Sequence, residues 1–308
     1  MSFNVPVLFY SSLALIAFAA NSVLCRMALG GQTIDAMSFT LIRLLSGSVM
    51  LILLVCLFER NNIGHVFRVN VNRSKVKKSP IQTYALGILG PLFLFIYAAG
   101  FSYAYVSLDT GIGALILFAV VQITMIMVIF IRGNRLNLGE SVGLLVGFLG
   151  FVYLLYPSLT GPSLYGLILM SLSGVAWGGY SILGQSKNDQ IVTHSSLVKT
   201  ANNFVLSLPF ALFLLIIMFN DATLSLKGVL LSSLAGAITS GLGYAIWYKA
   251  LLYLTTTRAA VAQLLVPVLA SVGGLLFLNE LLTLHLIVSS IVVLGGILIV
   301  VLSRKQIV

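Results

Sequence analysis

Charged residues are scarce in this chain. They make up 8% of its 308 residues, whereas hydrophobic residues make up 59%. A soluble domain of this length carries about a quarter of its residues as charges. The chain has too little polar material to cover a water-facing surface, so its surroundings must be apolar, as in a lipid bilayer. The same scarcity excludes a sizeable soluble domain.

Clusters that hold metals or perform catalysis are also missing. The two cysteines, Cys25 and Cys56, lie in apolar stretches without metal-site or disulfide spacing. His65, His194 and His285 lie in or near expected loops, and no Gly-x-Ser-x-Gly motif or His/Asp/Glu cluster is present. We therefore expect no enzyme activity, no metal and no cofactor.

Acidic residues are absent from the middle of every apolar run. All seven lie at run ends or in loops: Asp35, Glu59, Asp109, Glu140, Asp189, Asp221 and Glu280. A buried carboxylate marks many proton or ion pathways in membranes. Proton coupling therefore has no support from a carboxylate in mid-membrane.

What the chain does have is ten long apolar segments, each near the 20 residues that a membrane helix needs. They cover 6–29, 36–57, 81–106, 110–131, 139–156, 162–184, 195–219, 228–253, 257–278 and 284–302. The first segment has no Lys or Arg before it and continues past a small-residue stretch, so we interpret it as a retained span. The predicted fold class is an all-α integral membrane protein with ten transmembrane helices.

The net charge of +10 comes mainly from segments between these helices. With the N-terminus in the cytoplasm, cytoplasmic segments hold twelve Lys or Arg residues and opposite segments hold only Lys227. Cytoplasmic loops carry such an excess. We therefore expect both termini in the cytoplasm, a multi-pass location in a bacterial inner membrane, and no nucleic-acid partner.

The two halves of the chain resemble each other. Shifting by 146 residues aligns 90–155 with 236–301 without a gap, and a shift of 159 places Phe18 on Trp177. Five helices in each half give the halves opposite orientations, which is the inverted repeat of many transporters. The predicted repeats span 1–157 and 158–308.

The end of the second repeat carries a more specific pattern. Pro267 is followed by Asn279-Glu280-Leu-Leu-Thr283 and then by an apolar run with Gly295-Gly296. This resembles the EamA family of the drug/metabolite transporter superfamily. In the first repeat, Asn134 stands at the place of the glutamate and Val121 at that of the proline. The resemblance implies ten helices and export of amino acids, drugs or related small metabolites without ATP.

Aromatic and amide side chains near mid-span are the candidate substrate-binding residues. Amides in a membrane need partners, and aromatic walls with a few amides suit a small, partly apolar ligand. Two cations inside spans are candidates for binding a carboxylate or phosphate. The predicted set is Phe18, Asn21, Arg43, Tyr97, Phe101, Gln122, Trp177, Tyr180, Lys199, Tyr244, Trp247 and Gln263.

Two positions are candidates for gating, because glycine and proline soften helices. These are Gly243, within Gly241-Leu-Gly243, and Pro267. The leading hypothesis is a secondary exporter of small metabolites such as amino acids. The alternatives are an uptake or exchange carrier for an anionic or nucleoside-like metabolite, and a membrane scaffold or lipid-handling protein that transports nothing.

Overall fold

The computed structural model describes residues 5–68, 80–131, 137–156, 163–184, 195–217, 223–251, 254 and 262–303. Regular structure in this part of the chain is helical, with one isolated antiparallel bridge between Ile34 and Leu224. The predicted all-α class is confirmed.

The apolar segments of the sequence correspond closely to helices. The helices are α1 Val5–Gly30, α2 Ala36–Phe58, η1 Arg60–His65, α3 Pro80–Tyr105, α4 Thr110–Ile131, α5 Leu138–Leu155, α6 Leu164–Gly184, α7 Ser196–Ile217, α8 Leu226–Leu234, η3 Ala235–Leu242, α9 Gly243–Leu251, α11 Leu265–Leu278 and α12 Leu284–Ser303. α8, η3 and α9 follow one another directly. The ninth predicted span differs most: its described part is interrupted at Leu264, so α11 begins at Leu265.

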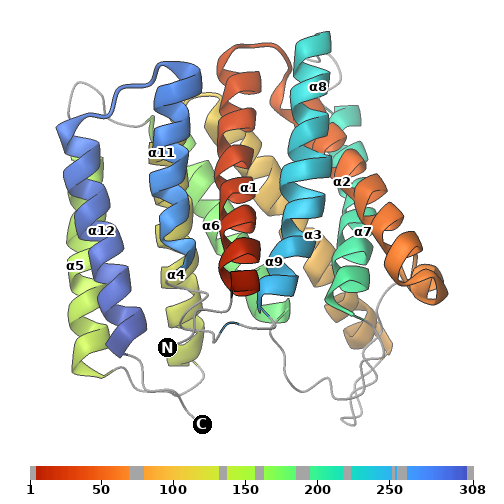
Figure 1. The fold of residues 1–308 in the computed structure, drawn as a ribbon, viewed down its shortest axis with the longest axis horizontal. Helices are drawn as coiled ribbons and strands as arrows, with labels where there is room; N and C mark the ends of the chain where they lie inside the picture. Colours follow the sequence, from red (N-terminus) through yellow and green to blue (C-terminus); the bar gives the residue numbers. More distant parts are fainter. Residues whose placement is uncertain are drawn as a thin grey trace.

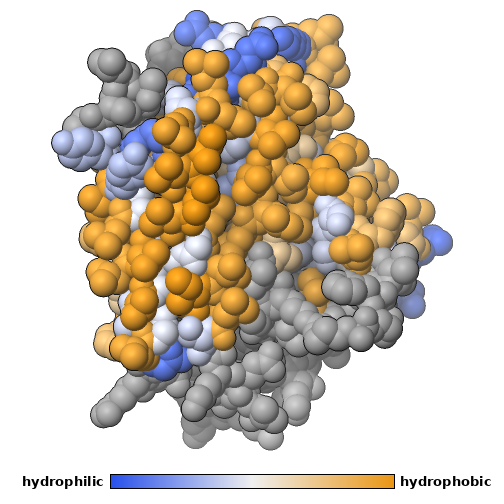
Figure 2. Space-filling model, turned by 60° about the vertical axis from the view of Figure 1, so that its left-hand side comes forward, coloured by the Kyte–Doolittle hydropathy of each residue, from blue (hydrophilic) through white to orange (hydrophobic). Residues whose placement is uncertain are grey.

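Eight described helices are long and apolar enough to cross a membrane, and two apolar helices, Leu138–Leu154 and Leu265–Leu278, are shorter. Large hydrophobic side chains cover the outer surface; Ile291 and Leu302 of α12, for example, are 66% and 65% exposed. Figure 2 shows a broad hydrophobic flank with hydrophilic residues gathered towards its ends. Exposing such an extended hydrophobic surface to water would be unfavourable, so the chain is a multi-pass membrane protein.

The helices form a broad bundle in which segments from the two halves pair (Figure 1). α5 packs against α12, α4 against α11, α3 against α6, and α2 against α7. α1 lies between α11 and the α8–η3–α9 rod. α1 begins and α12 ends on the same side of the bundle.

Glycine sets the closest of these contacts. A Cβ on Gly143 of α5 would lie 2.7 Å from the carbonyl oxygen of Gly296 in α12, and one on Gly296 would lie 2.7 Å from the carbonyl oxygen of Gly143. Gly174 and Gly178 of α6 likewise face α4. These glycines therefore serve close helix packing.

At the end of the bundle where α1, α3 and α11 finish, here called the distal end, polar contacts join the helices. Arg26 of α1 contacts Asp109 at 3.1 Å and Glu280 at 3.5 Å. Glu280 also accepts hydrogen bonds from the Thr110 backbone N–H at 2.9 Å and from its hydroxyl at 2.9 Å, which caps α4. Burial raises the pKa of Glu280, while the bonds from Thr110 oppose that rise.

A second set of hydrogen bonds joins segments from the two halves of the chain at the distal end. The Thr33 carbonyl accepts from the Ser225 N–H at 3.0 Å, and the Thr223 N–H donates to Asp35 at 3.0 Å. Asp35 also caps α2 by accepting from the Ser38 N–H at 2.8 Å. The bundle is therefore fastened at the distal end in this conformation.

Candidate substrate-binding pocket

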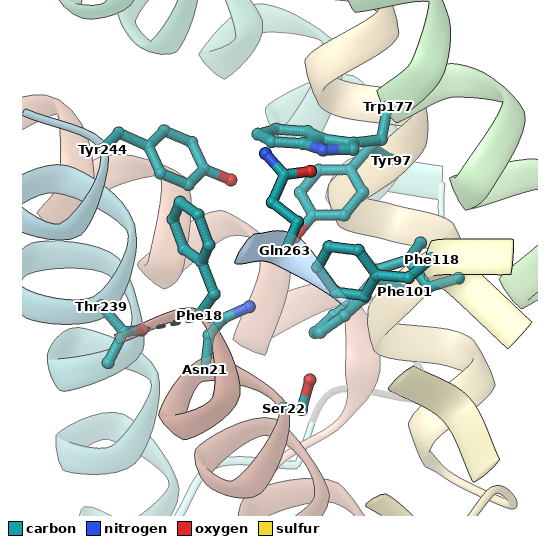
Figure 3. Close-up of a pocket in the computed structure, with 11 residues that line it drawn as sticks. Phe18, Asn21, Ser22, Tyr97, Phe101, Phe118, Trp177, Thr239, Tyr244 and Gln263 are labelled. Atoms are coloured by element: carbon teal, nitrogen blue, oxygen red, sulfur yellow. Dashed lines mark hydrogen bonds between the residues drawn. The ribbon is translucent and has the colours of Figure 1, made fainter. Parts of the chain in front are cut away.

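A pocket lies within the bundle between α1, α3, α4, α6 and the α8–η3–α9 rod (Figure 3). Its space not filled by atoms is about 420 Å³, including the part that is open to solvent. Its lining residues are Phe18, Asn21, Ser22, Tyr97, Phe101, Leu117, Phe118, Trp177, Thr239, Tyr244 and Gln263. Seven of the twelve predicted binding residues are among them.

Aromatic rings form most of the pocket wall. Trp177 is central: its ring centroid lies 4.8 Å from that of Tyr97 and 5.2 Å from that of Tyr244. Phe18 meets Tyr244 edge to face at 5.7 Å. Tyr97 and Phe101 are only 5% and 1% exposed, so the pocket is almost closed in this conformation. Rings in these geometries give a rigid apolar wall for a flat or aliphatic solute.

Polar atoms are few and come from both halves of the chain. Asn21 of α1 accepts a hydrogen bond from the Thr239 hydroxyl at 3.2 Å. Figure 3 shows the Asn21 nitrogen turned away from that bond and the Gln263 amide beside the Trp177 and Tyr97 rings. These amides can bind either a donor or an acceptor of a solute.

The π-helix η3 places one hydroxyl in the pocket lining and a second one against Arg43. Thr239 reaches Asn21, and the next residue, Ser240, accepts from Nε of Arg43 at 3.2 Å. η3 also lies against α2 so closely that a Cβ on Gly236 would collide with the carbonyl oxygen of Arg43. π-helical turns are rare and gather at functional sites, because the extra residue changes which side chains face inward.

Arg43 stands immediately behind the wall. Its side chain is 2% exposed, and Nη2 donates to the Tyr97 hydroxyl at 3.1 Å. Its guanidinium carbon lies 5.3 Å from the Tyr97 ring and 5.0 Å from the Phe101 ring. Nη1 is buried and makes no hydrogen bond. Arg43 does not extend to the membrane surface but points into the bundle.

Arg43 is surrounded by neutral partners. A charged side chain inside a membrane bundle is costly and normally pairs with an opposite charge or with backbone carbonyls. The partners of Arg43 are hydroxyls and rings, and Nη1 has no hydrogen-bond partner.

Besides Arg43, four other predicted binding residues lie outside the pocket lining. Trp247 is 6% exposed and packs on Phe18 at 5.7 Å, and Tyr180 stacks on Trp177 at 5.4 Å, so both support the wall from behind. Gln122 lines a separate, mostly apolar cleft between α4, α5 and α12. Lys199 is partly exposed in the first turn of α7.

The two predicted gating positions lie at helix junctions. Gly243 is buried where η3 passes into α9, and a Cβ there would lie 3.0 Å from that of Ala17. Pro267 is buried in the first turn of α11, where its missing N–H removes no bond within that helix. Pro267 therefore lies shortly after the break in the helix at Leu264.

Four lining residues were not in the predicted set. Ser22 lies on the same face of the first span as Phe18 and Asn21, so helical spacing contains that signal. Leu117 and Phe118 are typical of any membrane helix and carry no signal. Thr239 reaches the pocket through a π-helical turn, which regular 3.6-residue spacing does not predict.

An internal pocket with aromatic walls and a few amides, enclosed by a bundle of membrane helices, defines a membrane transport protein. Residues 164–302 match the EamA-like transporter family. The chain is 42% identical to an uncharacterized protein of Pseudomonas aeruginosa over 95% of this chain and 93% of that one. It is 31% identical to an uncharacterized transporter of Archaeoglobus fulgidus over 79% and 85% of the two chains. The chain belongs to the EamA-like transporter family.

Two more distant similarities complete the comparison. The chain is 26% identical to a probable amino-acid metabolite efflux pump of Salmonella typhimurium, over 73% of this chain and 77% of that one. A chain in a solved crystal structure, 17% identical, superposes with a TM-score of 0.62 over 95% of this chain and 97% of that one. That likeness concerns the fold alone.

Proposed function

We propose that this chain is a secondary transporter that exports small metabolites such as amino acids by alternating access. The observation that carries the proposal is the nearly closed aromatic pocket inside the bundle, built from both halves of the chain. Binding at such an interface lets a rocking motion of the halves expose the site to each side in turn.

The helix bounds support two equivalent halves. α3 covers 80–105, and adding 146 gives 226–251, the range of the α8–η3–α9 rod. α5 and α12 begin 146 residues apart, and a shift of 159 places Phe18 of α1 on Trp177 of α6. Pro91 in α3 shifts to position 237, inside η3, so both members of that pair contain a helix irregularity. Five helices in each half make the repeat inverted in this proposal.

The packing has the corresponding symmetry. Exchanging each helix for its repeat partner turns the α3–α6 contact into the contact of the rod with α1, and the α4–α6 contact into α11–α1. The α2–α7, α4–α11 and α5–α12 contacts map onto themselves. The pocket lies on the symmetry axis that this exchange of the two halves implies. Phe18 and its repeat partner Trp177 both line the pocket, as do Leu117 and its repeat partner Gln263. Both halves thus contribute equivalent wall positions.

The amino-acid class rests on two observations. The Salmonella relative is named as a probable amino-acid metabolite efflux pump. In this chain, rings from five different helices line a pocket that also offers the amides of Asn21 and Gln263. The excess of Lys and Arg in the loops on one side favours an orientation with both termini in the cytoplasm.

Transport by the purified protein in liposomes tests the proposal. We expect uptake of at least one labelled amino acid above that of empty liposomes, measured across a panel of amino acids, amines and nucleoside-like metabolites. Repeating the panel with and without a pH gradient examines proton coupling. Failure of every solute to exceed empty liposomes would overturn the proposal in favour of a scaffold or lipid-handling role.

Gating at Gly243 and Pro267 is part of the proposal. Pro267→Ala is expected to slow transport while the protein still accumulates normally, because the proline breaks the path of the chain before α11. An unchanged rate would remove Pro267 from the gate.

A second candidate is uptake or exchange of an anionic metabolite. The buried guanidinium of Arg43 beside the pocket favours it. Lys199, the other predicted anion-binding residue, is not among the pocket-lining residues. The direction of flux in oriented vesicles separates this candidate from export.

A further inference from the structure

Arg43 has an unsatisfied charge and an unsatisfied nitrogen. Its hydrogen-bond partners are the hydroxyls of Ser240 and Tyr97, and both are neutral. Both ion pairs found within the described part of the chain belong to Arg26. The side chain is 2% exposed, and the buried Nη1 makes no hydrogen bond. A buried cation in this position needs an anion.

Packing alone does not account for this arrangement. A structural arginine in a membrane bundle normally pairs with a carboxylate or with backbone carbonyls. Arg26 does both: it contacts two carboxylates and donates to the carbonyls of Tyr105 and Val106. Arg43 has neither kind of partner among these contacts. Its ring contacts involve Tyr97 and Phe101, which are also pocket walls.

We propose that Arg43 is the anchor for a carboxylate of the transported solute. The solute then supplies the negative charge that the neighbours of Arg43 do not provide. This inference rests on the proposed transport function and specifies its substrate class: a solute with one carboxylate and an apolar body. The aromatic rings around Trp177 contact the body, and Nη1 of Arg43 binds the carboxylate.

The chemistry of the pocket favours a carboxylate over a phosphate. A phosphate dianion needs more than one cation and several donors. The pocket lining contains no cation, and Arg43 behind it offers a single charge and one nitrogen that makes no hydrogen bond. A carboxylate carries one charge and matches that supply. The lining also contains no carboxylate that would repel it.

Tyr97 and Ser240 hold the Arg43 side chain in place when no solute is bound. They bind Nη2 and Nε from α3 and from η3, so the guanidinium is held between the two halves even when no solute is bound. A carboxylate at Nη1 adds a charge-assisted bond to this cross-connection. The solute thereby stabilises a closed pocket.

The test uses four probes that share one phenyl ring: phenylalanine, 3-phenylpropionate, phenylalaninamide and phenethylamine. Binding to the purified wild-type protein in detergent is measured by ligand-induced thermal stabilisation, and flux is measured in liposomes. Charge-assisted bonds contribute about 1.5–3 kcal/mol, which corresponds to roughly tenfold to a hundredfold in affinity. We expect the two carboxylates to bind at least about tenfold more tightly than the amide and the amine.

Substitutions test whether Arg43 is the source of the preference for carboxylates. Arg43→Gln is expected to abolish the preference for carboxylates, and Arg43→Lys, which keeps the charge, to restore part of it. Lys249→Gln is the matched control, since Lys249 lies over the Tyr10 ring, away from the pocket lining, and is expected to leave the preference unchanged. If Arg43→Gln does not fold, the four probes on wild-type protein still decide the question.

The outcomes separate the two proposals. Carboxylate binding that depends on Arg43 without any flux supports the anchor and overturns transport. Flux of the amine and amide at rates similar to the carboxylates supports transport and overturns the anchor. An Arg43→Gln variant that folds and keeps the carboxylate preference also overturns it, as does absence of binding by both carboxylates at millimolar concentration.

Discussion

The pocket region and the α5–α12 pair are built on opposite principles. The pocket region contains aromatic rings, amides, a π-helix and a buried arginine. α5 and α12 are regular helices in which glycines bring the backbones together. The pocket walls hold polar groups that have to be matched by partners. The middle of the pair is held by close backbone packing, and its polar contacts, Asn137 to the Ser303 carbonyl and His285 to the Tyr153 carbonyl, lie towards the helix ends. The contrast indicates where solute chemistry resides and where the molecule is only held together.

The largest expected effect distinguishes aromatic side chains in the two regions. Trp177→Ala removes a ring that contacts Tyr97, Tyr180 and Tyr244, and is expected to lower the free energy of unfolding by about 3–5 kcal/mol. The melting temperature in detergent measures this, and flux should fall with it. Tyr153→Ala on α5 is the control, because Tyr153 is 43% exposed and should change stability by less than about 1 kcal/mol. Equal effects would remove the contrast.

Adjacent glycines of α12 test how much close backbone packing contributes to the α5–α12 pair. Gly296→Ala places a Cβ against the backbone of α5 and is expected to destabilise by about 1–3 kcal/mol. A Cβ on Gly295 meets nothing within 4 Å, so Gly295→Ala should be neutral or slightly stabilising. Thermal melting of both variants measures the difference. Folded Gly296→Ala protein that keeps its flux would show that the pair is structural; loss of flux without loss of stability would contradict that view.

A smaller effect is expected for the hydrogen bond from η3 to α1. Thr239→Val keeps the side-chain shape and removes the donor to Asn21, at a cost of about 1 kcal/mol in stability. We expect an altered KM for the transported solute, since Asn21 lines the pocket. Ser289→Ala in α12 is the control: Ser289 bonds only along its own helix, to the His285 carbonyl, so transport should not change. An unchanged KM in Thr239→Val would indicate that the hydrogen bond from η3 to Asn21 does not affect solute binding.

The smallest effect concerns Glu280, in the loop that joins α11 to α12. Burial raises its pKa, so the folded protein binds this proton more tightly than the unfolded chain does. Its contribution to stability is therefore present at low pH and decreases as pH rises from the ordinary glutamate value to the raised one. We expect wild type to lose stability relative to Glu280→Gln, by less than about 1 kcal/mol, as pH rises above the ordinary glutamate pKa; thermal melting of both proteins across a pH series measures it. A gain in the relative stability of wild type as pH rises would contradict this reasoning.

Helices could be predicted from the sequence because each satisfies its own backbone within the membrane. α1, α2, α4 and α12 lie within one or two residues of their predicted spans. Apolar composition does not reveal the break at Leu264 within the ninth span, whose predicted start at 257 lies outside the described residues. Phe18 and Trp177 could be predicted as pocket residues because the repeat and the helical spacing place them on inward faces. Gln122 was predicted from its position midway along its span but faces a different cleft, since helix rotation depends on the neighbours.

The amino-acid sequence by itself determined that the chain lies in a membrane and where its helices run. These properties follow from hydrophobicity, which acts along each segment separately. Only the tertiary structure decided that Arg43 turns inward without an anion, while Arg26 finds two carboxylates. The environment of a charge depends on helices far away in sequence, because its partners come from whichever neighbours the packing brings into reach.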